Sequence, residues 1–272
     1  MHYDHLQDVA PIDFKRLTGV RPETFSAMLT ALQREARSFG RLTKLSLADQ
    51  LLLTLMYWRE YRTQFHIAQA YGVSEATVCR TIVRVEQALL RSGEFRLPGK
   101  KVLRQPDTPL SVVVLDATET PVERPPKKQR RAYSGKKKRH TQKSQVIADP
   151  FSRQILATAF GPGRQHDFAL FQASRTALLP RLEGWADSGY QGLRKQHAQS
   201  RTPQKRSKRH PLTPTEKAAN RALARQRIVI EHILRALKVF RILSERYRNR
   251  RKRFGLRFNL IAALYNYELP LK

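Results

Sequence analysis

The sequence predicts an α+β protein in two parts, an all-helical N-terminal part followed by a mixed β-sheet with flanking helices. Three observations support this fold class. Residues 1 to about 98 carry apolar residues at helical spacing, a β-branched run begins at Ser111, and strand-like and helix-like segments are mixed from there onward. With 272 residues, 40% of them hydrophobic, the chain is long enough to form a core in both parts.

Two helices are expected in the first half of the N-terminal part. Pro22–Ser38 has a proline at its start and Gly40 just past its end, which is the usual asymmetry of helix ends. Ser46–Arg62 opens with a serine that can cap a helix, and its Leu and Met residues recur at helical spacing.

Residues 65–90 have the spacing of a helix-turn-helix. Ala68 is small, as the crossing of two helices requires, and Gly72 follows four residues later, where a tight turn makes a Cβ costly. Val78 comes six residues further on, on the inner face of the second helix, and Ser74 can cap that helix. The alternative is an ordinary helical hairpin without a DNA-binding role.

The charge of the chain favours DNA binding over the plain hairpin. There are 52 Lys and Arg against 22 Asp and Glu, a net charge of +30, and so basic a protein needs a polyanionic partner, most often nucleic acid. A recognition helix presents its exposed N-terminal residues to DNA. The candidate DNA-contacting residues are therefore Ser74, Glu75, Thr77, Arg80 and Thr81. Arg80 is the best candidate for a guanine or phosphate contact.

The composition also argues against several classes of protein. No apolar run of about 18 residues and no signal-peptide pattern is present, so we expect a cytoplasmic, nucleoid-associated protein that does not bind membranes. The single cysteine, Cys79, permits no disulfide and no cysteine-based zinc site within one chain, and we expect it to be a small buried residue. His166 and His232 lack a second ligand at suitable spacing and are not expected to bind metal.

A linker is expected after the helical part, because Gly and Pro in Arg91–Lys100 interrupt the helical pattern. The expected domains are residues 1–98, a linker at 99–110, and a second domain at 111–272 with a basic insertion at about 194–214.

The second domain is expected to open with three strands, at Ser111–Thr118, Gln145–Ala148 and Gln154–Phe160. The turn residues of Asp149–Arg153 join the last two strands as a hairpin. A helix at Asp167–Leu178 and a short strand end at Gly184–Asp187 follow.

The remainder of the chain is expected to be mainly helical. Lys195–His210 is polar and basic without apolar periodicity, which predicts a loop or an insertion. Thr215–Ser244 predicts one long helix or two helices in series, and Phe254–Tyr267 predicts an amphipathic helix.

Three carboxylates lie on elements that are suitable for a phosphoryl-transfer site with two metal ions. Asp116 ends an apolar strand, where an acid is costly unless it is paired or binds metal; the alternative is a surface acid on an edge strand. Asp187 follows an apolar stretch and precedes a Gly-rich turn; the alternative is an ordinary turn residue. Glu231 shares a helix face with Arg227, four residues before it, and Lys238, seven after it; the alternative is a solvated row of ion pairs.

Three basic segments lie in the same part of the chain, at Lys127–Arg139, Arg194–His210 and Arg246–Arg257. A charge run is usually a solvated surface, but three of them near the carboxylates favour a groove that follows a phosphate backbone. The candidate DNA-binding residues of the first segment are Lys136, Lys137, Lys138 and Arg139. Tyr133, in the same segment, either stacks on an unpaired base or packs locally.

Five motifs, taken together and in order, carry a resemblance to a known family. They are LDATETPVERP (115–125), YSGKKKRHTQKSQ (133–145), GRQHD (163–167), DSGYQG (187–192) and RQRIVIEHILRALKVFRIL (225–243). With the helix-turn-helix before them, the chain resembles the bacterial insertion-sequence transposases of the DDE superfamily over most of its length. The resemblance is strongest to the insertion-sequence-five group, which is related to the Harbinger-type elements.

The resemblance implies a ribonuclease-H-like catalytic core in residues 111–272. In that family the first Asp lies on the first strand, the second Asp just after the fourth strand, and the Glu on a later helix. The matching residues, which would be catalytic and bind metal, are Asp116, Asp187 and Glu231. The family has a related Tyr-x₂-Arg-x₃-Glu-x₆-Lys signature. Its Arg and Lys match Arg227 and Lys238, which would hold DNA phosphates. Its Tyr is replaced by Ala224 in this chain.

The resemblance therefore implies a DNA transposase that binds element ends and catalyses metal-dependent strand cleavage and strand transfer. The metal would be Mg²⁺, for which Mn²⁺ can substitute. Its partners would be double-stranded DNA, as terminal inverted repeats and as target, and further copies of the chain in a homodimer or larger synaptic complex. Two alternatives are a DNA-binding repressor derived from a transposase that no longer cuts, and a metal-dependent nuclease without strand transfer. Retention of all three acids counts against the repressor.

Overall fold

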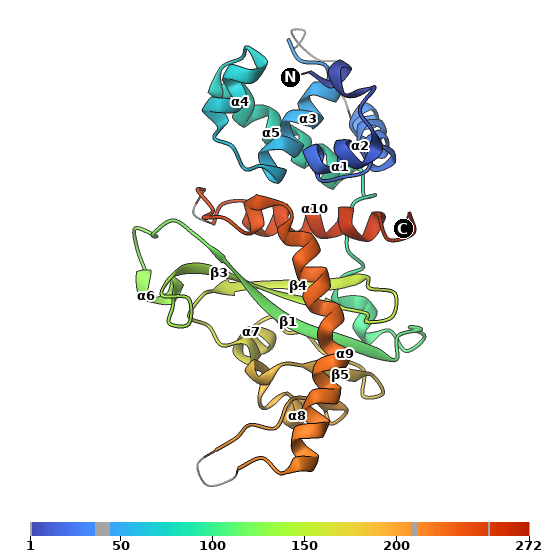
Figure 1. Ribbon diagram of the computed structural model, residues 1–272, viewed down its shortest axis with the longest axis vertical. Helices are drawn as coiled ribbons and strands as arrows, with labels where there is room; N and C mark the ends of the chain where they lie inside the picture. The colour runs from blue at the N-terminus through green and yellow to red at the C-terminus, as the bar shows by residue number, and fades with distance from the viewer. Residues whose placement is uncertain (1, 36–43, 208–210, 250, 272) are drawn as a thin grey trace. The chain divides into compact units, whose positions relative to one another are not determined.

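The structure is a computed structural model that describes residues 2–35, 44–207, 211–249 and 251–271 (Figure 1). The chain forms two compact units. The helical unit comprises residues 1–96, 237–245 and 253–272, and the sheet unit comprises residues 97–236 and 246–252. The predicted α+β class is confirmed, because the first unit is built from helices and the second from a mixed sheet with helices.

The helical unit contains α3 (Leu47–Arg59), which is buried on almost every side. Every residue from Asp49 to Trp58 is buried, and Ser46 caps the helix by accepting a hydrogen bond of 3.0 Å from the Asp49 N–H. The other elements of this unit are η1 (Tyr3–Leu6), α1 (Pro11–Thr18), α2 (Pro22–Glu35), α4 (Gln64–Tyr71), α5 (Glu75–Arg91), η4 (Arg241–Leu243) and α10 (Phe254–Tyr267). The first two predicted helices are thus present as α2 and α3, with residues 36–38 and Gly40 outside the described residues.

Helices α4 and α5 form the predicted helix-turn-helix. Gly72 ends α4 in the left-handed backbone conformation, at φ 61°, which glycine adopts without strain. Ser74 caps α5, since its Oγ accepts a hydrogen bond of 3.2 Å from the Thr77 N–H. Ala68 is 2% exposed and Val78 is fully buried, so both face the packed side of the motif.

The C-terminal helix α10 groups with the helical unit, whereas the sequence led us to expect it in the second domain. Glu86 of α5 is fully buried and accepts hydrogen bonds from Arg257 Nε at 2.6 Å and from Arg253 Nε at 2.5 Å. Within α10, all of which the structure describes, only Asn259 and Tyr267 are exposed. The prediction of an amphipathic helix is therefore wrong, because packing and ion pairs bury this helix nearly all round.

The sheet unit is a mixed sheet with the strand order β4-β3-β1-β5-β6, and the short β2 pairs with β3. The bounds are β1 (Val112–Pro121), β2 (Tyr133–Ser134), β3 (Arg139–Ala148), β4 (Ile155–Pro162), β5 (Glu183–Ala186) and β6 (Ser200–Arg201). β3 is antiparallel to both β1 and β4, whereas β5 is parallel to both β1 and β6. This is the ribonuclease-H-like mixed sheet that the resemblance implies.

The predicted hairpin joins β3 and β4. Asp149 closes the turn, since its carboxylate accepts hydrogen bonds from the Phe151 N–H at 3.0 Å and the Ser152 N–H at 3.3 Å. β3 starts at Arg139, earlier than predicted, because its first half is polar and does not look like a strand in the sequence.

Helices flank this sheet. They are η2 (Lys100–Arg104), α6 (Gln129–Ala132), α7 (Asp167–Ala173), η3 (Ser188–Tyr190), α8 (Leu193–Gln196) and α9 (Pro214–Lys238). Of the two alternatives for residues 215–244, one long helix is observed (Figure 1), and it ends at Lys238. α7 is shorter than predicted because Arg175, at φ 52°, leaves the helical conformation. In the parts of the chain that are described, no helix is both long and apolar enough to cross a membrane.

Two segments differ from their predictions. Residues 99–110, expected to be a linker, pack on the sheet unit: the Gly99 N–H donates to the Leu156 carbonyl at 2.8 Å, and Leu103 is fully buried. The expected basic insertion at 194–214 contains the edge strand β6, in which Ser200 pairs with Gly184; residues 208–210 lie outside the described part of the chain. A strand of two residues is too short to show alternation in the sequence.

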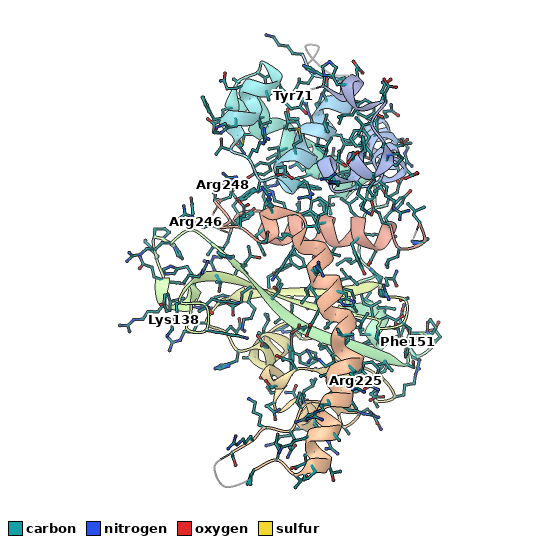
Figure 2. All side chains as sticks on the ribbon, viewed as in Figure 1. Tyr71, Lys138, Phe151, Arg225, Arg246 and Arg248 are labelled. Atoms are coloured by element: carbon teal, nitrogen blue, oxygen red, sulfur yellow. The ribbon has the colours of Figure 1, made fainter. Side chains whose placement is uncertain are left out.

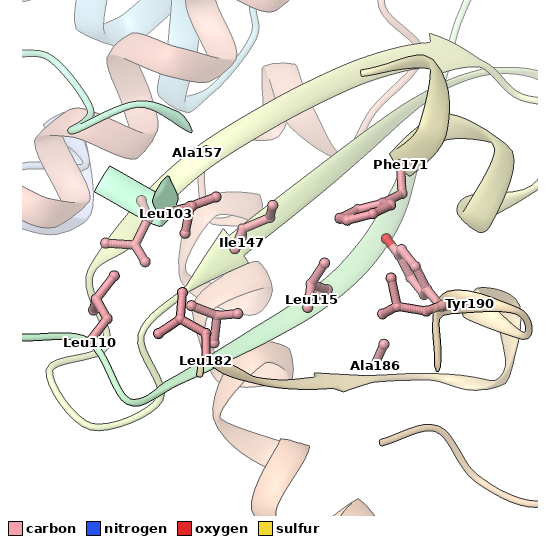
Figure 3. Close-up of a cluster of buried hydrophobic side chains, with 12 residues drawn as sticks. Leu103, Leu110, Leu115, Ile147, Ala157, Phe171, Leu182, Ala186 and Tyr190 are labelled. Carbon is pink, nitrogen blue, oxygen red and sulfur yellow. The ribbon is translucent and has the colours of Figure 1, made fainter. Parts of the chain in front are cut away.

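One cluster of buried hydrophobic side chains in the sheet unit is shown in Figure 3. The labelled side chains in Figure 3 include Leu115 of β1, Ile147 of β3 and Ala186 of β5, which the pairing of the strands brings together. Leu115 and Ala186 are fully buried. Hydrophobic burial therefore anchors β1 and β5 at the residues that directly precede Asp116 and Asp187.

Candidate active site

Two of the three candidate carboxylates lie next to each other at one edge of the sheet. Asp116 is on β1 and Asp187 directly follows β5, and in these parallel neighbours Leu115 pairs with Ala186. The register therefore places the next residue of each strand side by side. β5 ends at Ala186 whereas β1 continues to Pro121, so the region beyond the end of β5 is open to a ligand.

Helix α9 brings two further predicted residues to this edge. Arg227 Nη2 lies 3.9 Å from Asp116 Oδ1, and both Arg227 and Glu231 line the same cavity as Asp116 and Asp187. Arg227 and Glu231 are about one helical turn apart and therefore share a helix face. The buried Arg227 Nε has no hydrogen-bond partner, so the guanidinium keeps hydrogen-bonding capacity for a ligand.

Lys238 is not among the described residues that line this cavity, and its contact with a DNA phosphate stays a prediction. A helical wheel aligns it with Arg227 and Glu231 by angle, but seven residues of helix add a rise of about 10 Å. Lys238 is the last residue of α9 and belongs to the helical unit.

The cavity at this edge has a volume of about 620 Å³ and is rich in charges of both signs. Its acidic residues are Asp116, Glu119, Asp167, Asp187 and Glu231, and its basic residues are Lys136, Lys143, Arg164 and Arg227. Carboxylates bind divalent cations, whereas arginine and lysine bind phosphate oxygens. The lining therefore suits a polyanionic substrate that is bound together with divalent cations.

Asp116 and Asp187 repel each other when both are charged. The pKa of Asp116 is raised to about 6, first by burial and second by the Asp187 carboxylate. A hydrogen bond of 2.8 Å from the Ala117 N–H and the charge of Arg227 oppose this rise. Burial, followed by the charges of the surrounding Asp residues, also raises the pKa of Tyr190. A cation at this position would relieve the repulsion.

The same cavity contains a group of charges that the sequence did not predict. Lys143 of β3 has a side chain that is 9% exposed, and its Nζ lies 2.6 Å from Asp167 Oδ1 and 3.9 Å from Glu119 Oε1. Glu119 and Lys143 pair directly across β1 and β3, whereas Asp167 begins α7. Asp167 is part of the GRQHD motif, but no pattern in the sequence indicates that a lysine 24 residues earlier is its partner.

Asp167 also meets the turn that carries Asp187. The Gly189 N–H donates a hydrogen bond of 2.9 Å to Asp187 Oδ1. A Cβ at Gly189 would collide with Asp167 Oδ2 and would lie 3.0 Å from Asp187 Oδ1. Position 189 therefore requires glycine because two carboxylates approach it, and this close approach couples Asp167 to the position of Asp187.

The sequence of the chain matches two protein families and one named protein. The family described as "Transposase DDE domain" matches residues 107–267, and the family described as "Helix-turn-helix of DDE superfamily endonuclease" matches residues 43–95. The chain belongs to the DDE transposase family. It is 47% identical over 262 residues to the probable transposase for insertion sequence element IS702 of Microchaete diplosiphon, with 95% of each chain covered. No solved structure matches the chain.

A DDE transposase domain implies divalent metal ions, and the donor set of this site fits them. The candidate ligands are carboxylate oxygens, which Mg²⁺ prefers, and Asp116 and Asp187 are adjacent like charges with a raised pKa on Asp116. Within the described residues, no three Asp, Glu, His or Cys side chains are grouped so that they could hold one metal ion. The suitability of the site for a divalent cation therefore depends on the adjacent pair Asp116 and Asp187 and not on a group of three acids.

The helix-turn-helix of this transposase exposes most of the residues predicted to contact DNA. Those that are exposed or half-buried are Ser74, Glu75, Thr77 and Arg80. Thr81 is only 1% exposed, so its prediction as a DNA contact is wrong. At 100° per residue it lies near Val78 and Ile82 on the inner face of α5. Cys79, expected to be buried, is exposed instead.

The basic residues at 136–138 lie in the turn from β2 to β3, Arg139 is the first residue of β3, and all four are exposed. Lys136 lines the carboxylate cavity. The Lys137 N–H donates a hydrogen bond of 3.2 Å to Ser134 Oγ, which orders the turn. Lys138 is labelled at this turn in Figure 2. The transposase therefore has a basic turn next to its cluster of acids.

Proposed function

We propose that this DDE transposase binds the ends of its element through the helix-turn-helix and catalyses strand cleavage and strand transfer in the sheet unit. One observation carries the proposal: Asp116 and Asp187 are neighbours at the end of β5, and Arg227 and Glu231 of α9 line the same cavity. Oxygen ligands beside a guanidinium whose Nε has no hydrogen-bond partner suit an in-line displacement at a phosphate that two metal ions assist.

Each residue has its own role in this proposal. Asp116 and Asp187 would hold Mg²⁺, or Mn²⁺ in its place, and Glu231, which lines the same cavity but is not grouped with them, would add a ligand once metal and DNA are bound. Bound metal ions supply the activation of water or of a DNA 3′ hydroxyl and the stabilisation of the leaving oxygen. Arg227, whose Nε has no partner within the protein, binds a phosphate oxygen beside the scissile bond.

The proposed DNA partners are the terminal inverted repeats and the target duplex. The exposed residues at the start of α5 contact the inverted repeat, with Arg80 as the principal contact. The basic turn at residues 136–139 follows the phosphate backbone near the site of cleavage. Both ends must be cut together, so we propose a homodimer or a larger synaptic complex. With a net charge of +30, the protein is proposed to associate with the nucleoid.

The first test is cleavage of a labelled duplex that carries the end of the element. We expect nicking at the element boundary with Mg²⁺ and none with EDTA. Glu231→Ala is expected to lower the rate at least about a hundredfold, because a lost metal ligand removes several kcal/mol of transition-state stabilisation.

The same experiment separates the alternatives. Pre-cut ends are incubated with target DNA, and joined products distinguish a transposase from a nuclease, which would cut but not join. Tight binding of paired ends without cutting, in Mg²⁺ and in Mn²⁺, would contradict the catalytic proposal and point to a repressor.

Asp167 is proposed to position the turn that carries Asp187. Asp167→Asn removes the ion pair with Lys143 and the negative charge beside Gly189. We expect the Mg²⁺ concentration for half-maximal cleavage to rise about 10- to 100-fold, as for other residues that orient a metal ligand. Binding of the element end is expected to stay unchanged.

The matched control for Asp167 is Asp149→Asn. Asp149 is also an aspartate that accepts hydrogen bonds in the sheet unit, but it closes the hairpin between β3 and β4 and does not line the cavity. Its Mg²⁺ requirement should match that of the wild type. If Asp167→Asn behaved like this control, Asp167 would have no positioning role.

A further inference from the structure

A second cavity adjoins the carboxylate cavity in the sheet unit. It has a volume of about 580 Å³, and its wall includes side chains of Arg124, Gln129, Arg130, Tyr133, His140 and Arg164. Gly135 and Arg164 line both cavities, so the two share a wall. A ligand in the second cavity would therefore lie next to the proposed site of phosphoryl transfer.

Tyr133 provides an aromatic surface in this cavity. It pairs with His140 across β2 and β3, and the two ring centroids are 5.6 Å apart at an angle of 77°. This edge-to-face contact orients the Tyr133 ring, yet the residue remains 41% exposed. Local packing thus accounts for only part of the Tyr133 surface, and the rest is available for a stacked ligand.

The charge of the second cavity differs from that of the first. Its described lining residues include three arginines and no carboxylate, whereas five carboxylates line the neighbouring cavity. Arg124 is held in place, because its Nε donates a hydrogen bond of 2.9 Å to Gln129 Oε1. Arginines around an aromatic ring suit a ligand that has both a planar base and a phosphate.

The backbone around the cavity is closely packed. The Gly163 N–H donates to the Thr141 carbonyl at 3.0 Å, and the Arg164 N–H donates to the Arg131 carbonyl at 3.2 Å. A Cβ at Gly163 would lie 2.9 Å from the Ala132 carbonyl oxygen and would collide with Thr141 Oγ1. Glycine at 163 therefore lets the segment that carries Arg164 approach the segment that precedes Tyr133.

We propose that this cavity binds one unpaired nucleotide of the DNA strand whose neighbouring phosphate lies in the carboxylate cavity, an inference that rests on the proposed function. A paired base has both faces covered by its neighbours, so only a base that has left the duplex can stack on Tyr133. The volume lies within the range of about 300–1,000 Å³ that is usual for small-ligand pockets, which suits a single nucleotide and not a duplex. Arg164 contacts the phosphate between the two cavities.

The test compares two probes with the full chain in EDTA, so that no cleavage occurs. One probe is a blunt duplex, and the other is the same duplex with a short unpaired thymidine overhang at its 3′ or 5′ end. Affinities are measured by fluorescence anisotropy. We expect the wild type to bind one overhang duplex about 5- to 150-fold more tightly than the blunt duplex, the range that stacking of one base contributes.

Variants of Tyr133 test whether the preference for the overhang duplex arises from this cavity. Tyr133→Ala should abolish it while changing the blunt-duplex affinity less than about twofold, and Tyr133→Phe should keep it because a phenyl ring also stacks. The matched control is Phe151→Ala, since Phe151 is another exposed aromatic residue, 70% exposed, in the β3–β4 turn. Figure 2 shows it at the end of the sheet opposite to Lys138. This control should keep the preference. If Tyr133→Ala does not fold, Arg164→Ala tests the same preference through loss of the proposed phosphate contact.

The outcomes separate this inference from the proposed function. A wild type that binds blunt and overhang duplexes equally, or a preference that survives Tyr133→Ala, would overturn the nucleotide cavity alone. An equal loss of affinity for both probes in Tyr133→Ala would show a general DNA surface and would also overturn it. A wild type that binds neither probe would contradict the proposed DNA-binding function itself.

Discussion

Asp116→Ala is expected to lower strand cleavage by at least about a thousandfold, equivalent to about 4 kcal/mol of transition-state stabilisation. Asp116 contacts several parts of the site. It is the neighbour of Asp187 in the parallel register, it lies 3.9 Å from Arg227, and its pKa is raised to about 6 by burial and by Asp187. Removal of this carboxylate takes away one of the two adjacent aspartates that we propose as metal ligands, and it removes the negative charge beside Arg227.

Binding of the element end should be unchanged in Asp116→Ala, because the helix-turn-helix folds in the helical unit. The complementary variant is Arg80→Ala, which removes the principal proposed DNA contact on α5. We expect Arg80→Ala to weaken end binding about 5- to 150-fold, equivalent to about 1 to 3 kcal/mol. Its cleavage rate at saturating protein should stay close to that of the wild type.

Gel-shift and nicking assays on the same labelled end measure both effects. Wild-type cleavage by Asp116→Ala would show that the carboxylate site lies elsewhere. A loss of binding equal to the loss of cleavage would indicate that this variant is misfolded, and Asp116→Asn, which preserves the side-chain shape, would then decide the question.

Glu86→Ala is expected to destabilise the helical unit by about 3 to 5 kcal/mol, the usual cost of removing one partner from a buried ion pair. Glu86 is fully buried and accepts hydrogen bonds from Arg257 at 2.6 Å and Arg253 at 2.5 Å. The Trp58 indole N–H lies 3.3 Å from the same carboxylate. Without it, the charge of Arg257, a residue only 2% exposed, would remain buried without its counter-charge.

Urea unfolding of the full chain, followed by far-UV circular dichroism, measures this loss. The control is Asp13→Ala, since Asp13 forms an exposed pair with Arg16 at 2.9 Å, and its removal should cost less than about 1 kcal/mol. Glu86→Gln should fall between the two, because it keeps a hydrogen-bond acceptor but loses the charge. A midpoint for Glu86→Ala equal to that of Asp13→Ala would mean that the arginines can turn to solvent.

Glu86 lies on α5, the second helix of the helix-turn-helix, and its arginine partners lie at and near the start of α10. The ion pairs therefore connect the proposed recognition helix to a segment 171 residues further along the chain. This connection explains why α10 groups with the N-terminal helices, although the family match to the transposase domain extends to residue 267.

Much of the site could be predicted from local sequence patterns. Asp116 follows a β-branched run, Asp187 stands at the start of a Gly-containing turn, and Glu231 shares a helix face with Arg227. The helix-turn-helix was likewise predictable, because small residues, a turn glycine and a capping serine are all local requirements. Such patterns show which elements form and which side of each element is apolar.

The sequence by itself therefore determined the fold class and the position of the helix-turn-helix, and it singled out the three carboxylates that we propose as the site. The tertiary structure alone decided which of these residues meet. The pairing of β1 with β5 and the contact between Lys143 and Asp167 both depend on packing between distant segments. Periodicity carries no information about such contacts, because it reports the direction of a side chain around its own element and not the neighbour that it finds there.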